Sequence, residues 1–168
     1  MAVEVDHAIN SVLREVIVEH QFIGEALRRC WVRGITDVEV LRSESDSFGY
    51  DLVMGRGPIV RHIQLKTLRV GGKASDAKIG LKLMEKPSGC VIWIVVTPDL
   101  HFDHFLWFGG LPGAPLPDIT DLKVAKHTKG DSEGAKAERP AHRLVPRRRF
   151  EKLPSLDAVL VHLFGPMG

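Results

Sequence analysis

The eight residues Cys90–Thr97 constrain the fold more than any other part of the sequence. They are apolar almost throughout and rich in β-branched side chains, without alternation of polar and apolar positions. A strand of this composition is covered on both faces, which is typical of the centre of a sheet with further layers packed on it. We therefore expect an α/β fold, with Cys90–Thr97 near the centre of its sheet.

The rest of the chain supplies the other elements of this sheet and its helices. Apolar residues recur every three or four positions over 11–33 and over 155–164, which predicts an amphipathic helix in each segment. A short helix is also expected over 77–86, ahead of Pro87. Further strands are predicted at 38–40, 50–54, 59–68 and 105–108. These elements predict a single α/β domain whose mixed central sheet has about five strands and is flanked by helices.

Charge is divided unevenly along the chain. Residues 123–152 hold ten basic and four acidic residues, whereas the remainder holds thirteen basic and seventeen acidic ones. A basic segment on an acidic body favours a polyanionic partner such as DNA, and a solvated linker is the alternative. We predict an α/β core over 1–122, a basic and partly flexible loop over 123–152, and a C-terminal helix over 153–168 that packs on the core.

Cysteine usage and hydropathy exclude several classes of protein. Cys30 and Cys90 are the two cysteines of the chain, and two cysteines so far apart form neither a disulfide framework nor a zinc ribbon. The longest apolar run, 91–96, is too short to cross a bilayer, and residues 1–20 lack the pattern of a signal peptide. We expect a cytoplasmic protein that does not insert into a membrane.

The strands 50–54 and 59–68 form a predicted hairpin that carries the candidate chemistry. Side chains alternate along a strand, so Gln64 and Lys66 project to one face, and Asp51 on the partner strand can converge with them. A carboxylate, a neighbouring oxygen ligand and a lysine are the groups that a Mg²⁺-assisted phosphodiester hydrolysis needs. The oxygens hold the hard cation, and the lysine orients or deprotonates the attacking water.

This order of elements resembles the PD-(D/E)xK nuclease superfamily, which has the restriction-endonuclease-like fold. The resemblance covers about residues 11–108. It rests on Asp51, on the triplet Gln64-Leu65-Lys66 and on Glu25 in the first helix, in the order usual for that superfamily. It implies a DNA endonuclease that uses Mg²⁺ or Mn²⁺.

The resemblance implies a role for each hairpin position. Asp51 is expected to be the central metal ligand and the backbone carbonyl of Leu65 a second ligand. Gln64 stands where the motif usually has Glu or Asp, and it is expected to complete the metal site. Lys66 is expected to be the catalytic lysine.

The outlying helix carboxylate of the superfamily is assigned to Glu25. Glu19 is the alternative, and six residues of helix rotate by about 240°, so only one of the two can face the hairpin. The expected catalytic residues are therefore Asp51, Gln64, Lys66 and Glu25. The expected metal ligands are Asp51, Gln64, Glu25 and the Leu65 carbonyl.

Other functions and contacts stay open at this point. Gln64 removes one negative charge from the metal site, so the alternative is a nuclease-fold protein that has lost cleavage and binds nucleic acid or a protein. A third hypothesis is an interaction module whose interface is Phe105–Phe108. The resemblance also allows two copies to pair as a homodimer. The residues expected to contact phosphate are Lys73, Arg147, Arg148 and Arg149.

Overall fold

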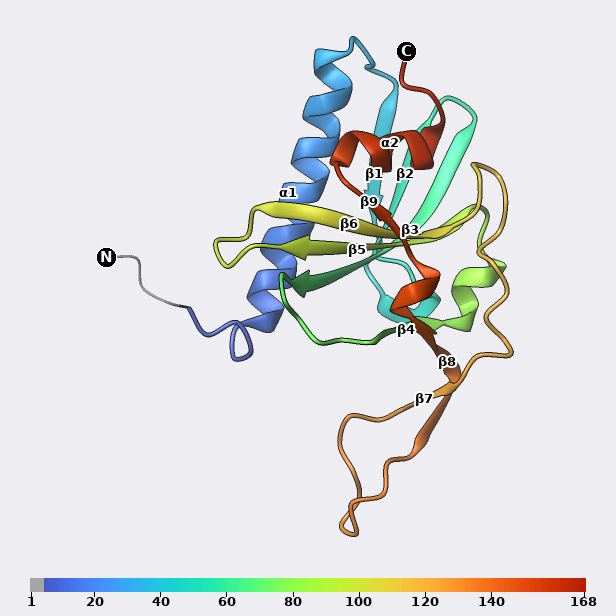
Figure 1. Cartoon of the computed structure of the whole chain (residues 1–168). Helices are drawn as coiled ribbons and strands as arrows, with labels where there is room; N and C mark the ends of the chain where they lie inside the picture. Colours follow the sequence, from blue (N-terminus) through green and yellow to red (C-terminus); the bar gives the residue numbers. More distant parts are fainter. Residues whose placement is uncertain (1–4) are drawn as a thin grey trace.

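The computed structural model describes residues 5–168, which form one α/β domain (Figure 1). The first four residues of the predicted core lie outside the described residues. Within the described chain the helices are α1 (Ser11–Val32) and α2 (Leu156–Phe164), with short 3-10 helices η1 (Asp46–Phe48), η2 (Leu81–Glu85) and η3 (Arg147–Arg149). The strands are β1 (Val38–Arg42), β2 (Leu52–Arg56), β3 (Ile59–Arg69), β4 (Asp76–Gly80), β5 (Gly89–Val96), β6 (Phe102–Gly109), β7 (Val124–Lys126), β8 (Glu138–Pro146) and β9 (Glu151–Leu153).

The larger sheet has β5 near its centre, as predicted. Its strand order is β1-β2-β3-β5-β6-β9, and β5 runs parallel to β3 and antiparallel to β6. Every residue of β5 is buried, because Ile92 and Ile94 pack in the core under α1 and α2 while Trp93 packs in a second core on the opposite face. The predicted fold class is confirmed, with six strands in this mixed sheet because β9 pairs with β6.

The apolar segment Phe105–Phe108 is part of β6 and is buried along its whole length. It pairs with β5 on one side and, in part, with β9 on the other. Its side chains supply both cores, so the hypothesis that this segment is an exposed interaction surface is wrong.

Helix α1 has nearly the predicted bounds but packs on a different side. The side chains that enter the core are those of Val18, Phe22, Ala26 and Cys30. Most of the apolar stripe that the periodicity indicated is exposed instead, namely Val12, Leu13, Val16, Ile17, Leu27 and Trp31. The helix has two apolar stripes, and a period of three to four residues does not tell which one faces the sheet.

Two predictions of local structure are wrong. Residues 77–86 are not a helix but the strand β4 followed by η2, because Ala77 and Ile79 are buried on alternate positions of the strand. The segment predicted as a basic loop contains β7 and β8, and β8 pairs with both β4 and β7 in a sheet of order β4-β8-β7. Within β8 only Val145 is buried, so its sequence has little periodicity and its structure depends on the neighbouring strands.

Helix α2 begins and ends as its sequence signals indicate. The Ser155 hydroxyl accepts a hydrogen bond from the Ala158 N–H at 3.2 Å, which is an N-cap, and Gly165 ends the helix with a φ of 81°. Its apolar stripe packs in the same core as α1. In the part of the chain that the structure describes, no helix combines the length and the apolar character needed to span a membrane.

Candidate functional site

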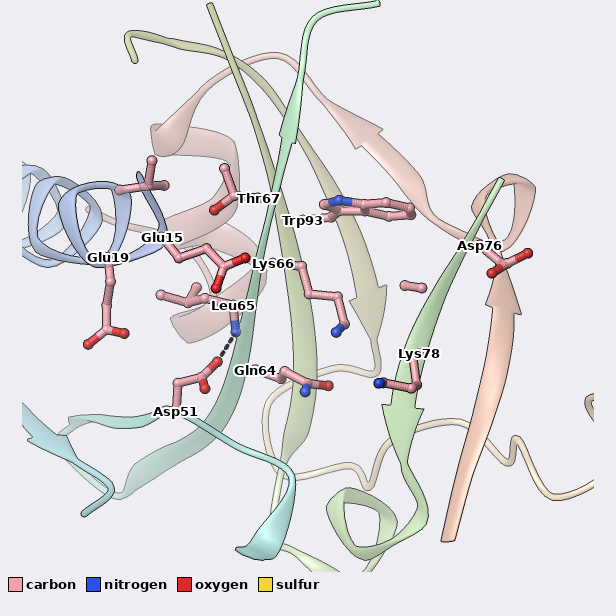
Figure 2. A pocket seen from close by; sticks show the side chains of 12 residues that line it. Glu15, Glu19, Asp51, Gln64, Leu65, Lys66, Thr67, Asp76, Lys78 and Trp93 are labelled. Atoms are coloured by element: carbon pink, nitrogen blue, oxygen red, sulfur yellow. Dashed lines mark hydrogen bonds between the residues drawn. The ribbon is translucent and has the colours of Figure 1, made fainter. Parts of the chain in front are cut away.

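Asp51 reaches the edge of β3 because the pairing of β2 with β3 is irregular at the start of β2. Leu52 is the register partner of Ile63, yet the Asp51 N–H also donates to the Ile63 carbonyl, at 2.9 Å. Two consecutive residues of one chain segment thus face a single residue of the other, as in a β-bulge, which redirects a side chain. The Asp51 carboxylate takes the place of a backbone acceptor, and its Oδ2 accepts from the Leu65 N–H at 2.6 Å (Figure 2).

The turn before Asp51 requires a glycine. Gly49 has a φ of 79°, in the left-handed region that other residues adopt at a cost. A Cβ at this position would also lie 3.4 Å from the backbone nitrogen of Leu83. Gly49 therefore lets the chain leave η1, pass close to η2 and enter β2 with Asp51 at the edge of β3.

Gln64 and Lys66 point to the same side of β3, as strand alternation predicts. Ile63 and Leu65 pack in the core on the helix side, so Gln64 and Lys66 stand on the side of the smaller sheet. Figure 2 shows both side chains there, whereas Asp51 lies on the other side of β3. The expectation that all three share one face is therefore wrong, because the bulge redirects Asp51 toward the strand edge.

All three side chains nevertheless line one cavity of about 390 Å³, which we call the hairpin cleft. Leu65 is also part of its wall. The N–H and carbonyl of one strand residue point to the same side of the strand, so the Leu65 carbonyl lies on the side of Asp51. The structure thus brings together at one cleft the four hairpin residues singled out from the sequence.

The oxygen atoms at the hairpin cleft fit a hard cation. Gln64 Oε1 is buried and has no hydrogen-bond partner within the described chain. It stands across β3 from the Asp51 carboxylate and the Leu65 carbonyl, which share one side of the strand. Mg²⁺ is usually bound through one or two carboxylates while it keeps several waters. Among residues 5–168, no three or more His, Cys, Asp and Glu side chains gather as a metal site, so the donor set depends also on the backbone oxygen of Leu65.

The helix carboxylate at the hairpin cleft is not Glu25. Glu25 lines a different cavity, and its carboxylate binds Arg28 at 3.0 Å, which holds the pKa of Glu25 below its ordinary value. Glu15 and Glu19 line the hairpin cleft instead, and Glu19 also pairs with Arg42 at 2.6 Å. The rotation argument holds, since only one of Glu19 and Glu25 faces the hairpin, but the choice between them was wrong because the helix packs through its other stripe.

Lys78 is a cation of the hairpin cleft that the sequence did not single out. It lies on β4, on the side of β3 where Gln64 and Lys66 stand (Figure 2). It was not singled out because residues 77–86 were expected to form a helix. In the strand that the structure shows, Lys78 lies between the buried Ala77 and Ile79 and therefore points away from the core. Strand alternation is the signal that would have found it.

The residues expected to contact phosphate lie outside the hairpin cleft. Arg147 Nη1 donates to the Gly72 carbonyl at 3.4 Å, and the Arg147 N–H donates to the Ser75 carbonyl at 2.8 Å. Lys73 therefore sits in a loop that is held against Arg147. The guanidinium of Arg149 lies 5.9 Å from the centre of the Phe108 ring.

Neither the comparison with protein-family models nor the search of curated proteins found a match for this chain.

Proposed function

We propose that this protein is a metal-dependent DNA endonuclease that hydrolyses phosphodiester bonds. The observation that carries the proposal is the hydrogen bond from the Leu65 N–H to the Asp51 carboxylate, in the wall of the cleft that Lys66 also lines. A carboxylate, a neighbouring backbone carbonyl and a lysine are the groups expected from the resemblance to PD-(D/E)xK nucleases. The resemblance supports the reaction class, and the geometry supports the site.

A Mg²⁺ or Mn²⁺ ion fits the donors of the hairpin cleft. Asp51 and the Leu65 carbonyl would hold it, with Glu15 or Glu19 on the side of α1, whereas Gln64 stands on the other side of β3. When bound, such an ion would stabilise the negative charge that develops on the phosphate. Glu19 replaces Glu25 in the proposed set, because Glu25 lies at another cavity.

The side chains of the cleft have separate tasks in this proposal. The hydrogen bond from the Leu65 N–H holds the Asp51 carboxylate at the edge of β3, in the wall of the hairpin cleft. Lys66 places its ammonium where it can orient a water molecule and donate to a phosphate oxygen. Lys78 adds a second positive charge that attracts the phosphate group.

A second function is favoured by one observation. Gln64 points toward Lys78 and away from Asp51 (Figure 2), and an amide contributes no negative charge to hold a cation. A protein that keeps the nuclease fold but only binds nucleic acid or a protein partner would tolerate this arrangement. We keep this as the alternative function.

The deciding experiment is incubation with supercoiled, linear and branched DNA in Mg²⁺, in Mn²⁺ and in EDTA. Asp51→Asn is expected to abolish cleavage because it removes the only anionic ligand on the hairpin. Lys66→Ala is expected to lower the rate by roughly 10²- to 10⁴-fold, the range for a lost proton-transfer group, while DNA binding is kept. Glu25→Gln is the matched control and should leave cleavage unchanged.

Gln64→Glu separates the two functions. It restores a carboxylate at the position and should tighten Mg²⁺ binding, because a hard cation prefers a carboxylate to an amide. If Gln64→Glu cleaves DNA and the natural protein does not, the natural protein has the alternative function, which is binding without cleavage. If neither protein cuts any DNA with either metal, the endonuclease proposal is wrong.

A further inference from the structure

A second cavity, of about 520 Å³, continues from the hairpin cleft between β3 and the smaller sheet. The two cavities share Gln64, Lys66 and Lys78 in their walls. Lys82 and Arg139 also line the second cavity, and none of the wall residues that the structure describes is acidic. We call this cavity the basic groove.

The four cations of the basic groove come from separate parts of the chain. Lys66 lies on β3, Lys78 on β4, Lys82 on η2 and Arg139 on β8. The pairing of β4 with β8 places the smaller sheet opposite β3, so these charges converge on one concavity. A concave site lined by charge of one sign focuses the electric field and concentrates a polyanion.

A buried side-chain oxygen also faces the basic groove. Gln64 Oε1 is buried without a hydrogen-bond partner in the described structure, and Figure 2 shows Gln64 and Lys78 pointing toward each other. A buried acceptor that forms no hydrogen bond costs free energy. A bound molecule that carries both anionic oxygens and hydrogen-bond donors would attract the lysines and give this amide oxygen a donor.

An exposed aromatic ring lies beside the basic groove. Phe48 is 42% exposed, and its neighbours Ser47 and Gly49 line the groove. The ammonium groups of Lys82 and Lys86 lie 5.4 and 4.6 Å from the centre of this ring. An aromatic ring beside a positively charged groove is the combination with which proteins bind single-stranded nucleic acids, because bases stack on the ring while the backbone follows the charge.

We propose that the basic groove binds the backbone of a single nucleic-acid strand and that Phe48 stacks on one of its bases. The volume of the groove is that of a site for a drug-sized molecule, which suits one or two nucleotides and not a duplex. The inference rests on the proposed function in one respect, namely that the bound nucleic-acid strand continues into the hairpin cleft, where cleavage is proposed. Binding itself requires no cleavage.

The test is fluorescence anisotropy with a labelled single strand of about 12 nucleotides, a length in the range that one binding module covers. EDTA is present throughout, so the affinity is measured without metal or cleavage. The triple variant Lys78→Ala, Lys82→Ala and Arg139→Ala is expected to weaken binding by roughly 10-fold or more. Lys126→Ala, Lys129→Ala and Lys136→Ala remove the same charge outside the groove, and this matched control should bind nearly as well as the natural protein.

Phe48→Ala tests the stacking step and is expected to weaken binding by roughly 5-fold or more, while Phe48→Tyr keeps the affinity. A duplex of the same sequence should bind at least roughly 10-fold more weakly than the single strand. Equal losses in the groove variant and the control would overturn the groove assignment, and equal affinity for duplex and single strand would overturn the choice of ligand. Because no metal is present, these results are independent of whether the protein cuts DNA.

Discussion

Arg61 is the one charged side chain that the described core encloses completely. Its Nε donates to the Leu163 carbonyl at 2.9 Å, and its Nη2 donates to the carbonyls of His162 and Gly110 at 2.7 and 2.8 Å. Two of these carbonyls belong to the last turn of α2, where the helix dipole favours a cation. Burial lowers the pKa of the Arg61 guanidinium, and the three carbonyls and the Trp107 ring, 5.2 Å away, compensate for lost water.

We expect Arg61→Met to lower the free energy of unfolding by about 3 kcal/mol, because it leaves buried carbonyls of α2 without a donor. Urea denaturation followed by tryptophan fluorescence measures the change. Arg28→Ala is the control, since the exposed pair Arg28–Glu25 contributes about 1 kcal/mol at most. A loss for Arg61→Met no larger than for this control would contradict the stabilising role of Arg61.

At the scale of residues, the sequence predicted which side chains form the candidate site better than it predicted where they point. Alternation along a strand was enough to place Gln64 and Lys66 on the same side of β3. It was not enough for Asp51, because a bulge depends on how two strands pair and has no signal in the local sequence. Glu25 was preferred to Glu19 for a similar reason, since the side on which α1 packs is decided by the sheet beneath it.

At the scale of elements, the outer side of α1 is the largest anomaly. The helix has 22 residues and is about 33 Å long. Val12 and Trp31, near its two ends, are 75% and 73% exposed, and Leu13, Val16, Ile17 and Leu27 lie exposed between them. Exposed apolar side chains gathered along one side of a helix are typical of an interaction site. A second copy of the chain presents the same stripe and can therefore cover it through a two-fold interface.

We expect the protein to form a homodimer through α1. Two copies would also present two hairpin clefts, one to each strand of a duplex substrate. Leu13→Glu combined with Trp31→Glu should shift the protein from dimer to monomer in sedimentation velocity, because each copy buries a charge in the apolar contact. Val70→Glu with Leu111→Glu is the matched control, since these exposed apolar residues lie elsewhere. A natural protein that stays monomeric at all concentrations would contradict the prediction.

Elements with strong periodicity or clear caps were predictable, and elements that depend on neighbours were not. The helices α1 and α2 and the strand β5 carry their own signals, so their positions were predicted from sequence. β4 was mistaken for a helix because a short apolar run fits either period. β7 and β8 contain few buried residues, so the basic segment gave no sign of the smaller sheet in which β8 pairs with β4 and β7.

At the scale of the whole molecule, basic residues flank the hairpin cleft at both ends. Lys82 and Arg139 of the basic groove lie on one flank. On the other flank Asp76, which lines the cleft, pairs with Pro146, and Arg147 follows directly. The basic segment is therefore folded against the candidate site through β8 and η3, in contrast to the flexible loop expected from its composition. A strand that crosses the cleft would meet cations on both flanks.

We expect binding of a single strand to weaken steeply with salt, with a log–log slope of about −0.7 for each phosphate that a cation neutralises. Replacement of Arg147, Arg148 and Arg149 by alanine should make this slope less steep by about 1 to 2, because at most three phosphate contacts are lost. Titrations at several salt concentrations in EDTA measure it. Arg28→Ala, Arg33→Ala and Arg56→Ala remove the same charge near the end of α1 and serve as the control. If the slope of the η3 variant equals that of the control, these arginines do not contact the nucleic acid, and only the flank formed by the basic groove attracts it.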